Sequence, residues 1–231
     1  MSKTFFPYIE DKIFLKEVSS VFEIIDNSLK KIDGDFYDNV IDPFSALFDA
    51  SGQNIPLNKW VEQEKHRQLQ KTLQNGIGYF HQRILGHIGD WKDPGAGGIY
   101  DSENEKLKIF AQIKNKYNTF NSGSASDTYN TMCNLLNTTK KGYKGYVVII
   151  IPKTPNRFNK VFAPGGKTKR SDLLTVDGST YYEMVTGDKK ALLKLFLALP
   201  IAIAEVRKIK LKDFKTESTD FLDLFHRAYG V

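Results

Sequence analysis

The first third of the chain carries apolar residues at helical spacing. Residues 9–32 repeat apolar side chains every three or four positions and predict an amphipathic helix. Residues 40–50 predict a short helix, because Asp42 can cap it and Pro43 suits its first turn. Residues 58–87 form the longest helical pattern. We therefore expect this part of the chain to be helical.

From residue 89 the pattern becomes extended. Residues 89–98 are dense in glycine and proline and predict a loop. Residues 99–101 and 107–116 predict the two strands of a β-hairpin, joined by a polar turn at 102–105. Side chains alternate between the faces of a strand. The second strand therefore has one small apolar face, while its other face carries an amide and two ammonium groups.

The rest of the chain mixes helical and strand patterns. Residues 145–151, GYVVIII, form a continuous apolar run that predicts a buried central strand. The other elements are expected at residues 128–137 (helix capped by Ser126-Asp127), 157–163 (strand), 173–184 (hairpin or tight turn at Asp177-Gly178), 189–207 (helix broken near Pro200) and 219–229 (helix). This order predicts an α/β fold with a central mixed sheet flanked by helices.

Length and composition fit one domain. The 231 residues, 41% of them hydrophobic, suffice for a single core. We expect a helical part over about 1–88, an α/β core over about 89–210 and a C-terminal helix over about 216–229. The most apolar stretch, residues 191–203, is shorter than the ~20 residues that a membrane span needs. We expect no membrane association and no signal peptide.

Charge and cysteine content indicate the kind of binding partner and the cellular compartment. The formal charge is +6 and the pI is near 9.1, which fits a polyanionic partner such as nucleic acid. A basic protein without such a partner is the alternative. The single cysteine, Cys133, excludes an internal disulfide framework and favours the cytoplasm.

Three residues of the hairpin suggest chemistry. Asp101 ends the first strand, and a hairpin brings it beside Gln112 and Lys114 on the second. A carboxylate can hold Mg²⁺, which keeps several waters and binds phosphate oxygens. A neighbouring lysine can orient a water and offset charge on phosphorus. The set suits metal-dependent hydrolysis of a phosphodiester.

Other catalytic classes lack their motifs. The four histidines, His66, His81, His87 and His226, show no zinc spacing. The segment 165–168, GGKT, lacks the earlier glycine of a P-loop, and no GxSxG motif of a serine hydrolase occurs.

The chain resembles the PD-(D/E)XK nucleases, and within them the type II restriction endonucleases that cut GGNCC or GGWCC sites. The words VIDPFSALFDA (40–50), QLQKTLQNGIGYFHQRILGHI (68–88) and FAQIKNKYNTFNSGS (110–124) carry the likeness, which extends over residues 39–182. The family usually has glutamate where this chain has Gln112. A neutral amide oxygen is a weaker Mg²⁺ ligand than a carboxylate.

The resemblance implies a set of metal ligands, a reaction product and two partners. Asp101, Gln112 and the Ile113 carbonyl would hold Mg²⁺, and Lys114 would position the attacking water. Cleavage of double-stranded DNA would leave a 5′-phosphate. A homodimer would match the palindrome, and a cognate cytosine DNA methyltransferase is the expected partner. In related nucleases an N-terminal helix often adds a carboxylate, for which Glu64 is the candidate here and Glu62 its rival.

Several residues remain as alternatives or as DNA-binding candidates. Asp90 and Asp93 are alternative metal acids, ranked lower because they lie in a loop. Short polar groups and lysines are suited to phosphates and base edges. The first DNA-binding group follows the catalytic strand and comprises Lys116, Asn118, Thr119, Asn121 and Ser122. The second comprises Lys153, Arg157, Lys167, Lys169 and Arg170. The alternative for both is a hydrated surface.

Two rival functions remain open from the sequence. One is a repair nuclease of the same superfamily that selects DNA structure and not sequence. The other is a non-catalytic DNA-binding protein in which Gln112 marks a decayed site.

Overall fold

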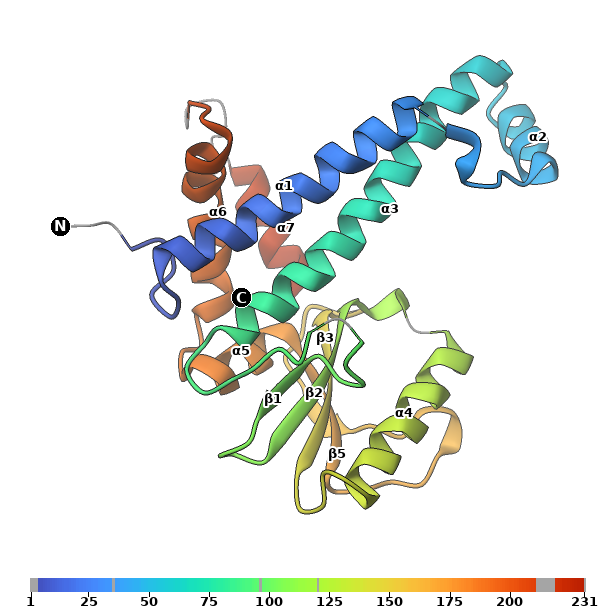
Figure 1. Ribbon diagram of the computed structural model, residues 1–231. Coiled ribbons are helices and arrows are strands. Elements are labelled where there is room, and N and C mark those ends of the chain that lie inside the picture. Colours follow the sequence, from blue (N-terminus) through green and yellow to red (C-terminus); the bar gives the residue numbers. More distant parts are fainter. Residues whose placement is uncertain (1–3, 35, 96, 120, 211–218, 231) are drawn as a thin grey trace. The chain divides into compact units, whose positions relative to one another are not determined.

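The computed structural model describes residues 4–34, 36–95, 97–119, 121–210 and 219–230 (Figure 1). Contacts divide the chain into two compact units, Ser19–Ile77 and Met1–Val18 with Gly78–Val231. The helix over residues 11–34 and the helix over residues 57–86 each have residues in both units. None of the helices described is both long and apolar enough to cross a bilayer.

The first unit is helical, as the apolar spacing predicted. It contains most of α1 (Asp11–Gly34), the short η1 (Phe36–Asp38), α2 (Pro43–Gly52) and most of α3 (Leu57–Gly86). The Asp42 side chain caps α2 by accepting from the Phe44 N–H, which confirms the predicted cap.

The second unit is built around a five-stranded mixed sheet. Its strands are β1 (Ser102–Asn104), β2 (Ile109–Lys116), β3 (Lys144–Ile151), β4 (Asn159–Val161) and β5 (Leu173–Asp177). The spatial order is β1-β2-β3-β5-β4. The three central strands are parallel, whereas both edge strands are antiparallel to their neighbours.

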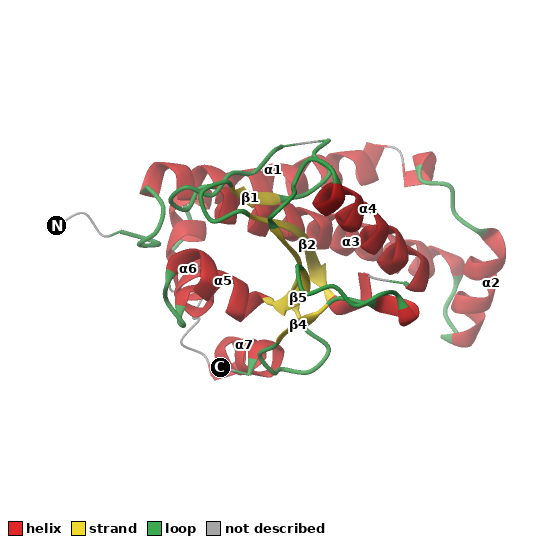
Figure 2. Ribbon diagram, turned by 90° about the horizontal axis from the view of Figure 1, so that it is seen from below, coloured by secondary structure: helices red, strands yellow, loops and turns green. Residues whose placement is uncertain are grey.

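Helices cover both faces of this sheet, which confirms the predicted α/β class (Figures 1 and 2). On one face, α4 (Ser122–Asn137) buries Met132 and its neighbours against Phe110, Val147 and Leu173 of the strands. On the other face, α5 (Gly178–Thr186) contributes Tyr181, whose ring meets that of Tyr146. α6 (Ala191–Arg207) and α7 (Thr219–Tyr229) follow, while residues 216–218 lie outside the described chain.

The hairpin exists, but the predicted position of its turn was wrong. The polar residues 102–104 form β1, and the turn occupies 105–108, where Lys108 has a φ of 52°. Ser, Glu and Asn favour turns locally. Here tertiary partners override that preference, because Ser102, Glu103 and Asn104 are all buried.

Three other predicted boundaries were wrong. α4 begins at Ser122 and not at 128, because Asn121 and Ser124 form a capping box. Asp177-Gly178 makes no hairpin, since Asp177 caps α5 instead. α6 runs through Pro200 unbroken, with Pro200 itself buried. Burial between apolar neighbours offsets the backbone hydrogen bond that proline removes.

Gly178 gives a test of the packing between α5 and β3. A Cβ at this position would lie 2.5 Å from the Ile150 carbonyl oxygen and 2.9 Å from its Cα. We expect Gly178→Ala to lower the free energy of unfolding by about 1–3 kcal/mol, measured by urea denaturation. Gly52→Ala is the control, because no atom lies within 4 Å of its Cβ. Equal stability of the two variants would contradict this packing.

Candidate active site

The site begins where β1 stops pairing with β2. The register places Ser102 opposite Ala111, and the Asp101 N–H donates to the Ala111 carbonyl at 2.8 Å. Asp101 therefore lies opposite Gln112, at the start of the stretch of β2 that β1 leaves unpaired. The Ile113 N–H points to this edge and donates to Asp101 Oδ2 at 2.6 Å. The carboxylate thus takes the place that the next strand residue would occupy.

Gln112 and Lys114 reach the same place from the face of β2. The Gln112 Nε2 donates to Asp101 Oδ2 at 2.5 Å, so two hydrogen bonds meet on one carboxylate oxygen. Both side chains share a face with Phe110, because residues two apart on a strand point the same way. α4 covers this face. The Ile113 carbonyl points to the same edge as its N–H. An acid, an amide, a carbonyl and an amine therefore converge.

Burial dominates the electrostatics of Asp101. It raises the pKa of the carboxyl above its ordinary value. The Ile113 N–H and the positive charge of Lys114 oppose this shift, and the negative charge of Asp93 adds to it. The ionised Asp101 carboxylate is thus partly removed from water, and a bound cation would stabilise its charge.

Asp93 comes close to this site because its loop pairs with β1. The Lys92 N–H donates to the Glu103 carbonyl at 2.8 Å, and the Glu103 N–H donates back at 2.9 Å. This bridge adds the loop to the outer edge of the hairpin. Asp93 is the next residue, and its charge acts on Asp101. The loop position gave no reason to rank Asp93 highly, and only the bridge reveals its proximity.

α3 fixes the Asp93 side chain. Gln82 Nε2 donates to Asp93 Oδ1 at 3.0 Å, and the Gly95 N–H donates to the same oxygen at 2.8 Å. A Cβ at Gly86 would lie 2.6 Å from the Asp93 Cβ, so glycine is needed where helix and loop meet. Gln82 was not predicted, because a lone glutamine on a helix gives no signal in the sequence.

The donors fit a hard divalent cation. Within the described residues, no three His, Cys, Asp or Glu side chains gather into a metal-binding group. The convergent donors are instead the Asp101 carboxylate, the Gln112 amide and the Ile113 carbonyl. These are oxygen ligands of the kind that Mg²⁺ accepts while it keeps several waters.

Comparison with known proteins agrees with this geometry. The family model described as Eco47II restriction endonuclease matches residues 6–208. The chain belongs to this family. It is 38% identical over 235 residues to the type II restriction enzyme Eco47II of Escherichia coli, which spans 96% of this chain and 98% of the relative. No solved structure matches the chain.

A second relative extends the likeness over the whole chain. The type II restriction enzyme Sau96I of Staphylococcus aureus is 26% identical over 238 residues, which span 99% of this chain and 91% of that enzyme. Family membership makes this chain a restriction endonuclease, and such enzymes generally use a divalent metal ion.

Glu64 lies in the helical unit of this endonuclease, whereas Asp101 lies in the other unit. Arg67 donates to both Glu64 oxygens, at 2.5 and 2.6 Å, and Gln68 donates at 3.1 Å. The hydrogen bonds from Arg67 lower the pKa of Glu64. Its carboxylate charge is thus already balanced locally. A metal-binding role for Glu64 or its exposed neighbour Glu62 stays a prediction.

The first predicted DNA-binding group lies directly beyond Lys114. Lys116 ends β2, and Asn118 and Thr119 follow in the short η2 (Tyr117–Thr119). Asn121 caps α4 and Ser122 opens it. All five side chains are exposed at the carboxyl end of β2. The N-terminus of α4 also offers backbone N–H groups that suit a phosphate.

The second predicted group does not gather in one place. Lys153 follows β3 and is exposed, while Arg157 pairs with Glu183 of α5. Lys167 donates to Asn130 at 3.2 Å, beside the middle of α4, and exposed Lys169 follows it.

Arg170 is the member of that group most firmly engaged. Its guanidinium donates to both Asp172 oxygens, at 2.9 and 2.8 Å, and to Asn137. Arg157 and Arg170 would have to leave these acids to read a base, which weakens both as candidates.

The raised pKa of Asp101 predicts a pH-dependent effect on stability. The folded form binds the proton more tightly than the unfolded chain, so ionisation favours unfolding. This penalty is absent below the unfolded pKa of about 3.9 and complete above the higher folded pKa. Without divalent metal, we expect Asp101→Asn to raise the melting temperature at neutral pH but not at pH near 3. A variant that is less stable at neutral pH would contradict this.

Proposed function

We propose that this endonuclease hydrolyses both strands of duplex DNA, with Mg²⁺, at an interrupted palindrome of the GGNCC type. The observation that carries the proposal is the convergence of Asp101, Gln112 and Lys114 at the unpaired edge of β2. The likeness to two type II restriction enzymes over nearly the full chain supports the reaction class. The specific target is an inference from the resemblance.

Asp101, Gln112 and the Ile113 carbonyl would hold Mg²⁺, and Asp93 is a further acid close enough for its charge to act on Asp101. A bound Mg²⁺ supplies Lewis-acid stabilisation of the charge that builds up on the phosphate. For Gln112 to offer its amide oxygen, the amide must release the hydrogen bond from Nε2 to Asp101. This exchange, besides the missing charge, would weaken metal binding relative to a glutamate.

Lys114 acts on the attacking water and on the phosphate. Its ammonium lies within electrostatic reach of Asp101, so it can orient a water in line with the scissile bond. Its positive charge also offsets the charge that develops on the phosphoryl oxygens. The bond to the 3′ oxygen breaks, which leaves a 5′-phosphate and a 3′-hydroxyl.

Substrate and partners follow from the same proposal. The exposed residues from Lys116 to Ser122 would contact the DNA next to the scissile phosphate. A palindrome presents the same half-site twice, so we propose a homodimer in which each subunit cuts one strand. A cognate cytosine methyltransferase would protect the host DNA, and both proteins would act in the cytoplasm.

Digestion of a sequenced genome with Mg²⁺, followed by end mapping, tests the function. We expect discrete fragments whose 5′-phosphorylated ends fall at one interrupted palindrome. Asp101→Ala and Lys114→Ala should reduce the cleavage rate by at least about 10³-fold while DNA binding persists in a gel-shift assay. Random ends would favour a repair-type nuclease, and intact DNA would favour a non-catalytic binding protein.

Gln112→Glu tests the role of the amide. The substitution adds a carboxylate and removes the Nε2 donor, so metal binding improves. We expect the Mg²⁺ concentration for half-maximal cleavage to fall several-fold, with activity retained. Gln70→Glu, which makes the same change at an exposed position of α3 in the helical unit, serves as the control and should leave the Mg²⁺ dependence unchanged. Loss of activity in a folded Gln112→Glu variant would exclude Gln112 as a ligand.

A further inference from the structure

The helical unit exposes an unusual number of large apolar side chains. They lie on η1, on α2 and beside both ends of α2, and we call them the α2 patch: Tyr37 (71% exposed), Val40 (94%), Phe44 (73%), Leu47 (66%), Phe48 (76%) and Leu57 (65%). Single exposed apolar residues need no explanation. Six of them within 21 consecutive residues are a concentration that does.

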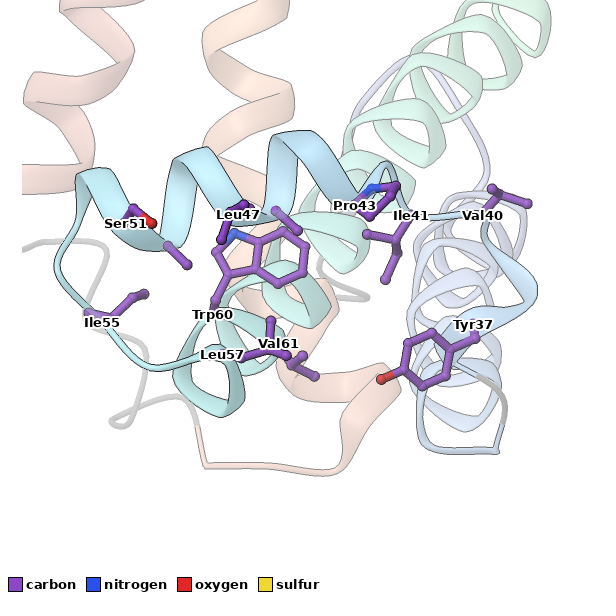
Figure 3. A pocket seen from close by; sticks show the side chains of 12 residues that line it. Tyr37, Val40, Ile41, Pro43, Leu47, Ser51, Ile55, Leu57, Trp60 and Val61 are labelled. Atoms are coloured by element: carbon purple, nitrogen blue, oxygen red, sulfur yellow. The ribbon is translucent and has the colours of Figure 1, made fainter.

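Four members of the patch, Tyr37, Val40, Leu47 and Leu57, line a groove (Figure 3). Trp60 is buried beneath α2 and donates from Nε1 to Asp49 at 2.9 Å, which fixes its ring. Leu47 and Leu57 border the opening, whose volume is about 680 Å³. The groove therefore has a buried, hydrogen-bonded tryptophan at its base and apolar side chains at its rim.

Charge argues against DNA or an anionic membrane as the occupant. Residues 37–61 contain three aspartates and a single lysine, in a chain of net charge +6. That lysine, Lys59, pairs with Glu62 at 3.1 Å. An acidic, apolar surface repels phosphates. Asp42 and Asp49 accept hydrogen bonds from Phe44 and Trp60, and both stay exposed, so their charge contributes to this surface.

The area matches that of a protein interface. If each of the six exposed side chains buries roughly 100–170 Å², together they offer roughly 600–1,000 Å². A typical stable interface buries about 800 Å² per partner. An apolar surface is also compatible with a second copy of itself, as a two-fold contact requires.

We propose that the α2 patch is the surface through which two copies of this chain associate. The proposal rests on the proposed function, because cleavage of both strands of a palindrome calls for two copies of a chain with one catalytic set. It adds the place of the contact, which lies entirely within the helical unit.

Molar mass without metal or DNA tests this proposal. We expect the full chain to approach twice its 26.3 kDa mass by analytical ultracentrifugation. Leu47→Glu should raise the dissociation constant of the dimer roughly 100-fold or more, because a two-fold axis buries the carboxylate twice. Val40→Glu should also raise the dissociation constant of the dimer. Because Val40 is the most exposed residue of the patch, this substitution should have little effect on the fold. Leu224→Glu on α7, 61% exposed, is the matched control and should leave the mass unchanged.

The outcomes separate this proposal from the proposed function. A monomeric wild-type chain, or a folded Leu47→Glu chain that stays dimeric, would overturn the patch as the interface, whether or not the enzyme cuts DNA. A shift to monomer supports it even if no cleavage is seen. With Mg²⁺, the monomeric variant should nick supercoiled plasmid more than it linearises it.

Discussion

The hydrogen bond from the Ile113 N–H to Asp101 is the interaction on which the site depends. It is possible only because β1 begins two residues too late to pair with Ile113. At the open edge of β2 the Ile113 N–H has no strand partner. Because Ile113 is buried, this N–H needs another hydrogen-bond acceptor. Asp101 satisfies it, and in doing so becomes a partly buried carboxylate. The position of the Asp101 carboxylate and its raised pKa therefore both follow from its place at the open edge of β2.

The rest of the fold holds this open edge in place. Glu103 on β1 binds Lys140 and Tyr100, which ties the hairpin to the segment after α4. On the other side, β2 is paired in parallel with β3 along almost its whole length. A small residue at Gly145 lets Met132 of α4 approach the sheet closely. β2 is thus paired and packed along most of its length, while the segment that follows it is exposed.

The two compact units differ in the surfaces they offer. The sheet unit presents polar and basic side chains at the carboxyl end of β2, where a polyanion can bind. The helical unit presents apolar side chains around α2 and an excess of acid there. Such a division suits a protein that must bind DNA with one surface and a protein partner with another, because phosphates and apolar groups need opposite environments.

Sequence alone determined the helices of the first third, the buried strand β3 and the hairpin that brings Asp101 beside Gln112, because periodicity and spacing are local properties of the chain. Tertiary structure alone decided the rest. Buried partners turned residues 102–104 from a turn into a strand, and a two-residue bridge brought Asp93 toward Asp101. Ion pairs engaged Arg157 and Arg170, and packing left α2 exposed. Contacts between distant residues decide these features, and no local pattern encodes them.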